Sequence, residues 1–243
     1  MSYYGYPKYV SVEEKKAKAE KALKKLKKNN PGLEPVIIEG RTLAKSWWGK
    51  AWNLNLESYA DYSNRIARGK SYVRSNAVLD LKLSKGRVTA IVQGSRAKPY
   101  DTEILIDTLN STKWRKISEL CNHRIDTLEQ LIEGKFPKEM EILFTDKRYS
   151  MFPSPKEIHF NCSCPDYASM CKHVAAVLYG IGARLDQNPL LFFELRDIDG
   201  RELIRKSMEQ KLDSMLKNAG RKSKRGIAAE DIPNIFGIRV PGT

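Results

Sequence analysis

The sequence predicts an α+β fold, in which a small antiparallel sheet with helices is followed by a metal-stapled strand–turn–helix (ββα-like) module and by C-terminal helices. Three observations predict it. A hairpin pattern occupies residues 76–93, the apolar period becomes helical from residue 111, and three of the four cysteines lie with a histidine within residues 162–173. The chain has 243 residues, of which 41% are hydrophobic, enough for a buried core.

The first element is a lysine-rich helix within a basic arm, residues 1–34. Ser11 and Glu14 have the spacing of a capping box, and Asn30, Pro31 and Gly32 follow the last predicted turn near Lys28. Residues 1–30 hold nine lysines against three glutamates, and residues 201–243 hold ten Lys or Arg against five acids. These two ends carry +6 and +5 of the chain's net charge of +14. The ends are therefore basic, and the body of the chain between them is nearly neutral. Basic ends suit a polyanion such as nucleic acid, although a lysine-rich helix can also serve solubility alone.

An α+β domain is predicted at residues 35–152, beginning with a short strand at residues 35–38. Trp48, Trp52 and Leu56 follow at helical spacing. A row of aromatic rings can form a base-stacking platform. We favour the other interpretation, a helix whose aromatic face packs into the core.

The segment at residues 62–74 is the best nucleic-acid candidate in the body of the chain. Basic side chains contact phosphate and aromatic rings stack on bases. Gly69-Lys70-Ser71 is not a P-loop, because that motif needs a glycine where Asn64 stands. The segment has no acid, interleaves Tyr62 and Tyr72, and holds the candidate contacts Arg65, Arg68, Lys70 and Arg74.

The sheet and the helices of this domain follow in order. Strands at residues 76–83 and 87–93 flank the turn Ser84-Lys85-Gly86, and a third strand is predicted at residues 102–107. Together with residues 35–39 they predict a small antiparallel sheet. Helices follow from residues 111, 125 and 137. Cys121 lies on the apolar stripe of the first of them, so we interpret it as a core residue and not as a ligand.

The cluster Cys162, Cys164, Cys171 and His173 predicts a zinc site at residues 153–186, where a strand at residues 156–161 leads into the cluster. Four Cys or His ligands are what a structural zinc ion takes. Cys162 and Cys164 face the same side of an extended segment. We expect Cys171 to precede a helix and His173 to lie in its first turn. His159 is the alternative ligand, but the Cys-x-His spacing favours His173.

C-terminal helices are predicted at residues 187–220, and a basic linker with an apolar peptide at residues 221–243. Lys172 beside the zinc ligands is a further candidate phosphate contact. The linker supplies four more, which are Arg221, Lys222, Lys224 and Arg225.

The C-x-C…C-x-H pattern, with Cys164-Pro165-Asp166 and Cys171-Lys172-His173, resembles the SWIM zinc finger. The resemblance extends to prokaryotic SWIM proteins of this length through other blocks, among them Trp47-Trp48-Gly49-Lys50-Ala51-Trp52, Tyr72-Val73-Arg74, Val92-Gln93-Gly94-Ser95 and Phe236-Gly237-Ile238. The resemblance implies a Swi/Snf-type helicase as a partner.

No catalytic motif is present, and four filled zinc positions leave none open for chemistry. The sequence therefore predicts a non-enzymatic protein with one structural Zn²⁺ that binds nucleic acid, expected to be DNA, beside a helicase-type ATPase. The alternatives are a protein-interaction scaffold whose basic ends dock an acidic partner, and a nuclease with scattered residues. No apolar stretch reaches membrane-spanning length and no small-molecule substrate is indicated, so we expect a cytoplasmic protein without a signal peptide.

Overall fold

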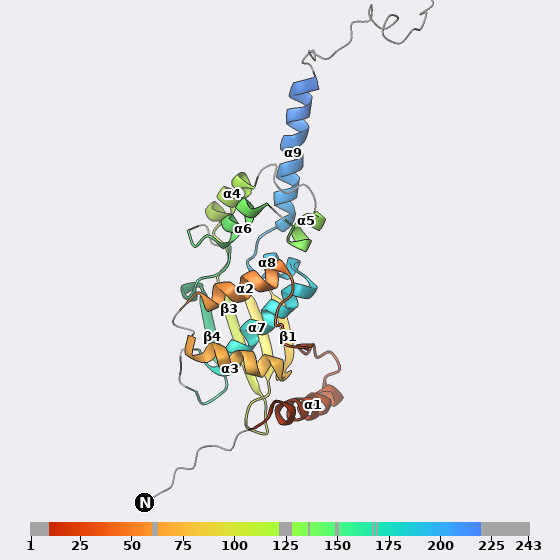
Figure 1. Cartoon of the computed structure of the whole chain (residues 1–243), viewed down its shortest axis with the longest axis vertical. Helices are drawn as coiled ribbons and strands as arrows, with labels where there is room; N and C mark the ends of the chain where they lie inside the picture. The colour runs from red at the N-terminus through yellow and green to blue at the C-terminus, as the bar shows by residue number, and fades with distance from the viewer. Residues whose placement is uncertain are drawn as a thin grey trace, which may run out of the picture.

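The computed structural model describes residues 10–59, 63–121, 128–135, 137–148, 151–166, 168 and 170–219 (Figure 1). The linker and peptide predicted at residues 221–243 lie outside these residues. Among the described residues, no helix combines the length and the apolar character that a membrane span requires.

A four-stranded antiparallel sheet forms the centre of the fold, which confirms the predicted α+β class. Its strands are β1 (Val78–Ser84), β2 (Arg87–Val92), β3 (Tyr100–Ile106) and β4 (Ile158–Cys162), in that spatial order. Gly86 closes the β1–β2 hairpin with φ +64°, a left-handed conformation that glycine adopts without strain. Alternate residues face the core, as in Val88, Ala90 and Val92.

The helix α7 (Lys172–Gln187) packs against all four strands and against the two helices α2 (Trp47–Glu57) and α3 (Ser63–Arg74) (Figure 1). Its apolar residues are buried along most of its length. The closest approach is at Gly69 of α3, where an added Cβ would lie 2.6 Å from the Cβ and 2.8 Å from the carbonyl carbon of Ala175. Glycine therefore lets the two helix backbones meet.

The tryptophan helix packs into the core, as we interpreted it. Trp48 and Trp52 have no exposed surface, so neither ring offers a stacking platform. Their indole N–H groups donate to the carbonyl oxygens of Leu131 and Leu178, each at 2.8 Å. Trp48 packs against Phe144, Phe192 and Phe193, which come from distant parts of the chain.

The remaining helices complete the fold, and the last of them projects from its body (Figure 1). The predicted capping box begins the first one, because Ser11 Oγ accepts from Glu14 N–H and the Glu14 carboxylate accepts from Ser11 N–H. Cys121 is buried, in agreement with its predicted core position. The bounds are α1 (Val12–Asn29), α4 (Ser111–Leu120), α5 (Leu128–Glu133), α6 (Lys138–Thr145), the 3₁₀ helix η2 (Pro155–Glu157), α8 (Leu190–Leu195) and α9 (Gly200–Ala219).

The prediction of a strand at residues 35–39 is wrong, and β4 is the fourth strand instead. The segment lies beside β1, with Val36 N–H bonded to the Val78 carbonyl and Leu81 N–H to the Glu34 carbonyl. The register of β1 shifts between Val78 and Asp80. The Asp80 carboxylate accepts from Glu34 N–H at 2.7 Å, so a side chain replaces a ladder hydrogen bond and no regular strand forms.

An ion pair with a buried arginine links η2, just before β4, to the C-terminal part of the fold. The Arg196 guanidinium has no exposed surface and donates to Glu157 at 2.8 Å. Burial alone would raise the pKa of Glu157, but hydrogen bonds from Arg196 and Ser154 outweigh it and lower that pKa. The pair contributes stability above the ordinary carboxyl pKa and loses it as the pH falls through the lowered value.

Replacing Gly69 with leucine should lower the free energy of unfolding by about 1–3 kcal/mol, because α3 and α7 must move apart. Urea denaturation followed by circular dichroism measures the loss. Ala67→Leu, at an exposed position of the same helix, is the control and should change stability by less than about 0.5 kcal/mol. Equal stabilities of the two variants would contradict close packing at Gly69.

The Glu157→Gln variant should lose about 3–5 kcal/mol of stability at pH 7, because it leaves a buried guanidinium without its counter-charge. The difference from the wild-type protein should shrink as the pH falls through the lowered pKa of Glu157, because the wild-type carboxylate is then protonated as well. Denaturation midpoints measured over a series of decreasing pH values, beginning at neutral pH, test both effects. A difference that does not depend on pH would exclude the ion pair as its cause.

Candidate metal centre

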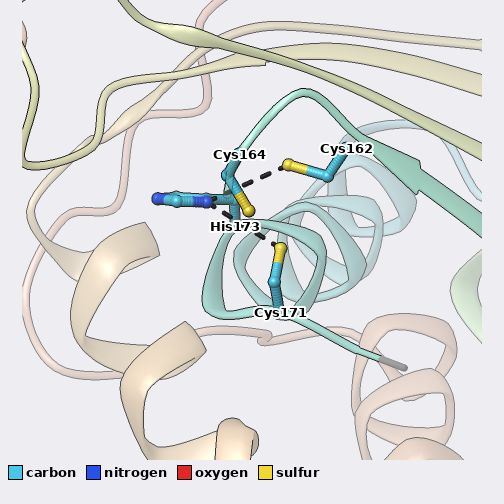
Figure 2. A group of neighbouring side chains, drawn as sticks. All are labelled: Cys162, Cys164, Cys171 and His173. Atoms are coloured by element: carbon cyan, nitrogen blue, oxygen red, sulfur yellow. Dashed lines mark hydrogen bonds between the residues drawn. The ribbon is translucent and has the colours of Figure 1, made fainter. Parts of the chain in front are cut away.

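The four predicted ligands lie together between the end of β4 and the start of α7 (Figure 2). Cys162 is the last residue of β4, and Cys164 follows in the turn. Cys171 is the N-cap of α7 and His173 lies in its first turn, as predicted. The site therefore joins the edge strand of the sheet to its central helix.

Local hydrogen bonds hold the C-x-C segment in place. Cys162 pairs with Thr102 of β3, whose hydroxyl lies 3.5 Å from the Cys162 sulfur. Beyond the strand, Ser163 N–H donates to the Asp101 carbonyl at 3.0 Å, and Asp101 N–H donates to Ser163 Oγ at 2.9 Å. The two cysteines thus keep an extended, sheet-anchored backbone, which places both sulfurs on one side.

The ligand atoms have the spacing that a tetrahedral metal ion requires. All four lie within 4.8 Å of one another. His173 Nδ1 is 4.0 Å from the sulfur of Cys162 and 3.8 Å from that of Cys171. Ligands roughly 2.0–2.3 Å from a zinc ion are about 3.6–3.8 Å apart. Three thiolates and one imidazole are a preferred zinc set, so the cluster fits a single structural zinc ion.

Within the cluster Cys162 favours thiolate, the form that binds metal, and Cys171 favours the protonated thiol. A hydrogen bond from the Cys171 thiol is the main cause that lowers the pKa of Cys162, and His173 and Thr102 add to it. That same hydrogen bond, followed by burial, raises the pKa of Cys171. Cys171 Sγ also accepts from Val174 N–H at 3.5 Å, at the positive end of α7. A bound zinc ion would hold both sulfurs as thiolates.

Aromatic packing orients His173. Its ring lies 4.5 Å from the Tyr100 ring and 5.4 Å from the Tyr72 ring, between centroids. Gly94 closes the third side, because an added Cβ would come within 2.8 Å of His173 Nε2. Nε2 is buried and has no hydrogen-bond partner among the described residues, whereas Nδ1 faces the sulfurs. Packing therefore leaves Nδ1 as the metal-binding nitrogen.

An ion pair holds the loop between Cys164 and Cys171 against α3. The Arg65 guanidinium on α3 lies 3.4 Å from the Asp166 carboxylate, and both side chains are largely buried. Asp166 also accepts from Ala168 N–H at 3.3 Å. Arg65 thus stabilises the zinc loop from a helix that lies far away in the sequence.

The candidate phosphate contacts fall into different environments. Lys70 pairs with Glu57 at 2.9 Å and lies over the Tyr179 ring. Arg68 and Arg74 are exposed, and Arg74 Nε donates to the Arg41 carbonyl at 3.3 Å. Lys172 is half-buried. The remaining candidates lie outside the described residues and are Arg221, Lys222, Lys224 and Arg225.

The alternative ligand predicted from the sequence lies outside the cluster. His159 is exposed on the opposite side of β4, with Nε2 3.4 Å from Asp107, and it takes no part in the cluster.

Sequence reasoning missed the residues that support the site, which are Thr102, Ser163, Tyr72 and Tyr100. Among these, only Tyr72 carried a signal, because the Tyr72-Val73-Arg74 block is part of the resemblance to prokaryotic SWIM proteins.

Comparison with known proteins agrees with this geometry. Residues 161–180 match the family model of the SWIM zinc finger. The chain is also similar to the uncharacterized protein Rv2102 of Mycobacterium tuberculosis, with 33% identity over 183 residues. The alignment covers 72% of this chain and 66% of that protein, just under two thirds of its length. No solved structure matches significantly.

Purified protein should contain one zinc ion per chain, and Cys162→Ser or His173→Ala should lose it together with much of the thermal stability. The reason is that metal binding supplies folding free energy, on the order of 10 kcal/mol in small zinc fingers. Elemental analysis and thermal melting with and without a chelator measure both. Cys121→Ala and His159→Ala are controls that should keep the metal. A zinc-free wild-type protein would refute the metal centre.

Proposed function

Because the chain carries a SWIM zinc finger at residues 161–180, we propose that it is a non-enzymatic protein that binds nucleic acid, and specifically DNA. In this proposal the zinc ion is structural. Four protein ligands leave no open position for a substrate or an activated water. The ion stabilises the junction of β4 and α7, and the surrounding basic surface contacts the polyanion.

The observation that carries the proposal is positive charge that makes no ion pair with any described residue, on α3 beside the finger and on α1. Arg68 and Arg74 are exposed on α3, the helix that packs against α7. The chain as a whole carries +14. Phosphate contacts need such accessible cations. On α1 the exposed lysines are Lys18, Lys21, Lys24, Lys25, Lys27 and Lys28.

The proposed partner is a Swi/Snf-type helicase, and α9 is the surface proposed to meet it. In Figure 1 this helix projects from the body of the fold. Four of its apolar side chains are 58–63% exposed, at helical spacing: Met208, Leu212, Met215 and Leu216. An exposed apolar helix face of this kind suits a groove on a partner. The same feature supports the second candidate function, a protein-interaction scaffold.

The affinity for DNA should fall linearly with salt on logarithmic axes, with a slope of about −0.9 per phosphate contact on a duplex. Fluorescence anisotropy with labelled DNA measures the slope. Arg68→Gln with Arg74→Gln should reduce it by roughly 2. Lys113→Gln with Lys116→Gln, at exposed positions of α4, is the matched control, because it removes the same charge away from α3 (Figure 1). The proposal is wrong if the wild-type protein binds neither DNA nor RNA.

Affinity purification from the native host, with and without nuclease, tests the partner. We expect a helicase-type ATPase to survive nuclease treatment and to be lost in a variant with Leu212→Ser and Leu216→Ser. Glu209→Gln with Asp213→Asn, on the same helix, should retain it. Recovery of the ATPase only through intact nucleic acid would argue against direct docking on α9.

A further inference from the structure

One cavity in the described part of the chain differs from the others in charge. It has a volume of about 250 Å³ and lies between α1, the end of α3 and the loop after β2. Two lysines line it and no acid does. Each of the three other described cavities has at least one carboxylate in its lining: Asp186, Glu141 and Asp101 are examples. This cavity alone among the four is therefore suited to an anion.

The lining combines cations with an aromatic wall. Lys18 Nζ donates to the Ser95 carbonyl, which joins α1 to the loop. Lys15 is half-buried and makes no ion pair with any described residue. Tyr72 supplies the aromatic wall, and Val10 and Ala77 supply apolar surface. The cavity thus has an apolar, ring-bearing wall with a positive charge at its rim.

The loop that forms the third wall is fixed in shape. The Gln93 side-chain amide donates to the carbonyl oxygens of Gly94 and Arg96, at 2.9 and 2.8 Å. Ser75 on the opposite side donates its hydroxyl to the Tyr72 carbonyl at 2.9 Å. The walls are therefore held in place by the protein's own hydrogen bonds, as expected of a largely pre-formed binding site.

Size and charge together indicate the class of ligand. Small-molecule sites in proteins measure roughly 300–1,000 Å³, so this cavity fits one ring-sized group of a longer ligand. Because two lysines and no acid line the cavity, the ligand should carry a negative charge beside that group. A nucleotide has a flat ring next to a phosphate. In a duplex the base is stacked and paired, whereas in a single strand it is free to enter a pocket and stack on tyrosine.

Tyr72 connects the cavity to the metal centre. It lines the cavity, and its ring packs on His173. Gly94, between the cavity and the imidazole, would clash with His173 if it carried a Cβ. Metal binding that fixes His173 therefore also fixes two parts of the cavity wall.

We propose that this cavity holds one unstacked nucleotide of single-stranded nucleic acid, with the base against Tyr72 and the phosphate at Lys15 and Lys18. The inference rests on the proposed function and refines it, because it assigns strandedness and a contact site. It predicts a preference for single strands over duplex and for strands that carry bases over abasic ones.

Anisotropy titrations of the zinc-loaded, full-length protein test the charge contacts. The probes are a labelled single-stranded DNA 12-mer and the matching duplex. Lys15→Gln with Lys18→Gln should weaken single-strand binding at least about tenfold more than Lys24→Gln with Lys25→Gln. Both double variants remove two charges from α1, and Lys24 and Lys25 do not line the cavity. Equal losses in the two variants would overturn the inference.

An abasic 12-mer of the same charge tests the base contact. Stacking on one aromatic ring is worth about 1–3 kcal/mol per base, so the wild-type protein should prefer the base-bearing strand by roughly 5- to 150-fold. Tyr72→Leu should lose most of this preference while retaining zinc, as checked by elemental analysis. If Tyr72→Leu loses zinc, Ser95→Leu, which adds an aliphatic side chain to the lining of the cavity, should reduce the preference instead.

The outcomes separate this inference from the proposed function. Binding of duplex and abasic strands as tightly as the base-bearing strand would leave the proposed function intact and overturn the nucleotide site. Absence of binding to every probe, by the wild-type protein, would refute the proposed function and the site together.

Discussion

The coordination of one metal ion by Cys162, Cys164, Cys171 and His173 is the constraint on which the arrangement of the fold depends. It joins β4, an edge strand, to α7, the helix that contacts every strand and both α2 and α3. The loop between the ligands is too short to bury a core of its own, so the metal bonds replace the missing apolar contacts. The metal site thereby fixes the position of α7, and with it that of α2 and α3, relative to the sheet.

Features set by neighbouring residues could be predicted from the sequence, and features set by distant ones could not. The β1–β2 hairpin, the Trp48–Trp52 stripe and the Cys171 cap each depend on spacing within a few residues. The Arg65–Asp166 pair joins residues 101 positions apart, and the Asp80 carboxylate accepts from the Glu34 N–H, 46 positions away. No local pattern contains such pairings, which explains why residues 35–39 looked like a strand.

Charge in the sequence is also not the same as charge at the surface. Arg65 and Lys70 resemble Arg68 and Arg74 in the sequence, but in the fold they pair with Asp166 and Glu57. Their role is to stabilise the zinc loop and the helix layer. A basic segment thus divides into side chains that hold the structure and side chains that remain available to a ligand, and only the fold distinguishes them.

The segment beside β1 affects how this protein meets other chains. Open strand edges recruit further strands and lead to aggregation. Here the Val36–Val78 and Leu81–Glu34 hydrogen bonds occupy backbone groups along β1, and the opposite edge strand, β4, has five residues and ends at the zinc ligand Cys162. The irregular segment beside β1 therefore covers that edge of the sheet. Association through added strands is discouraged, and assemblies of this protein should form through its helices.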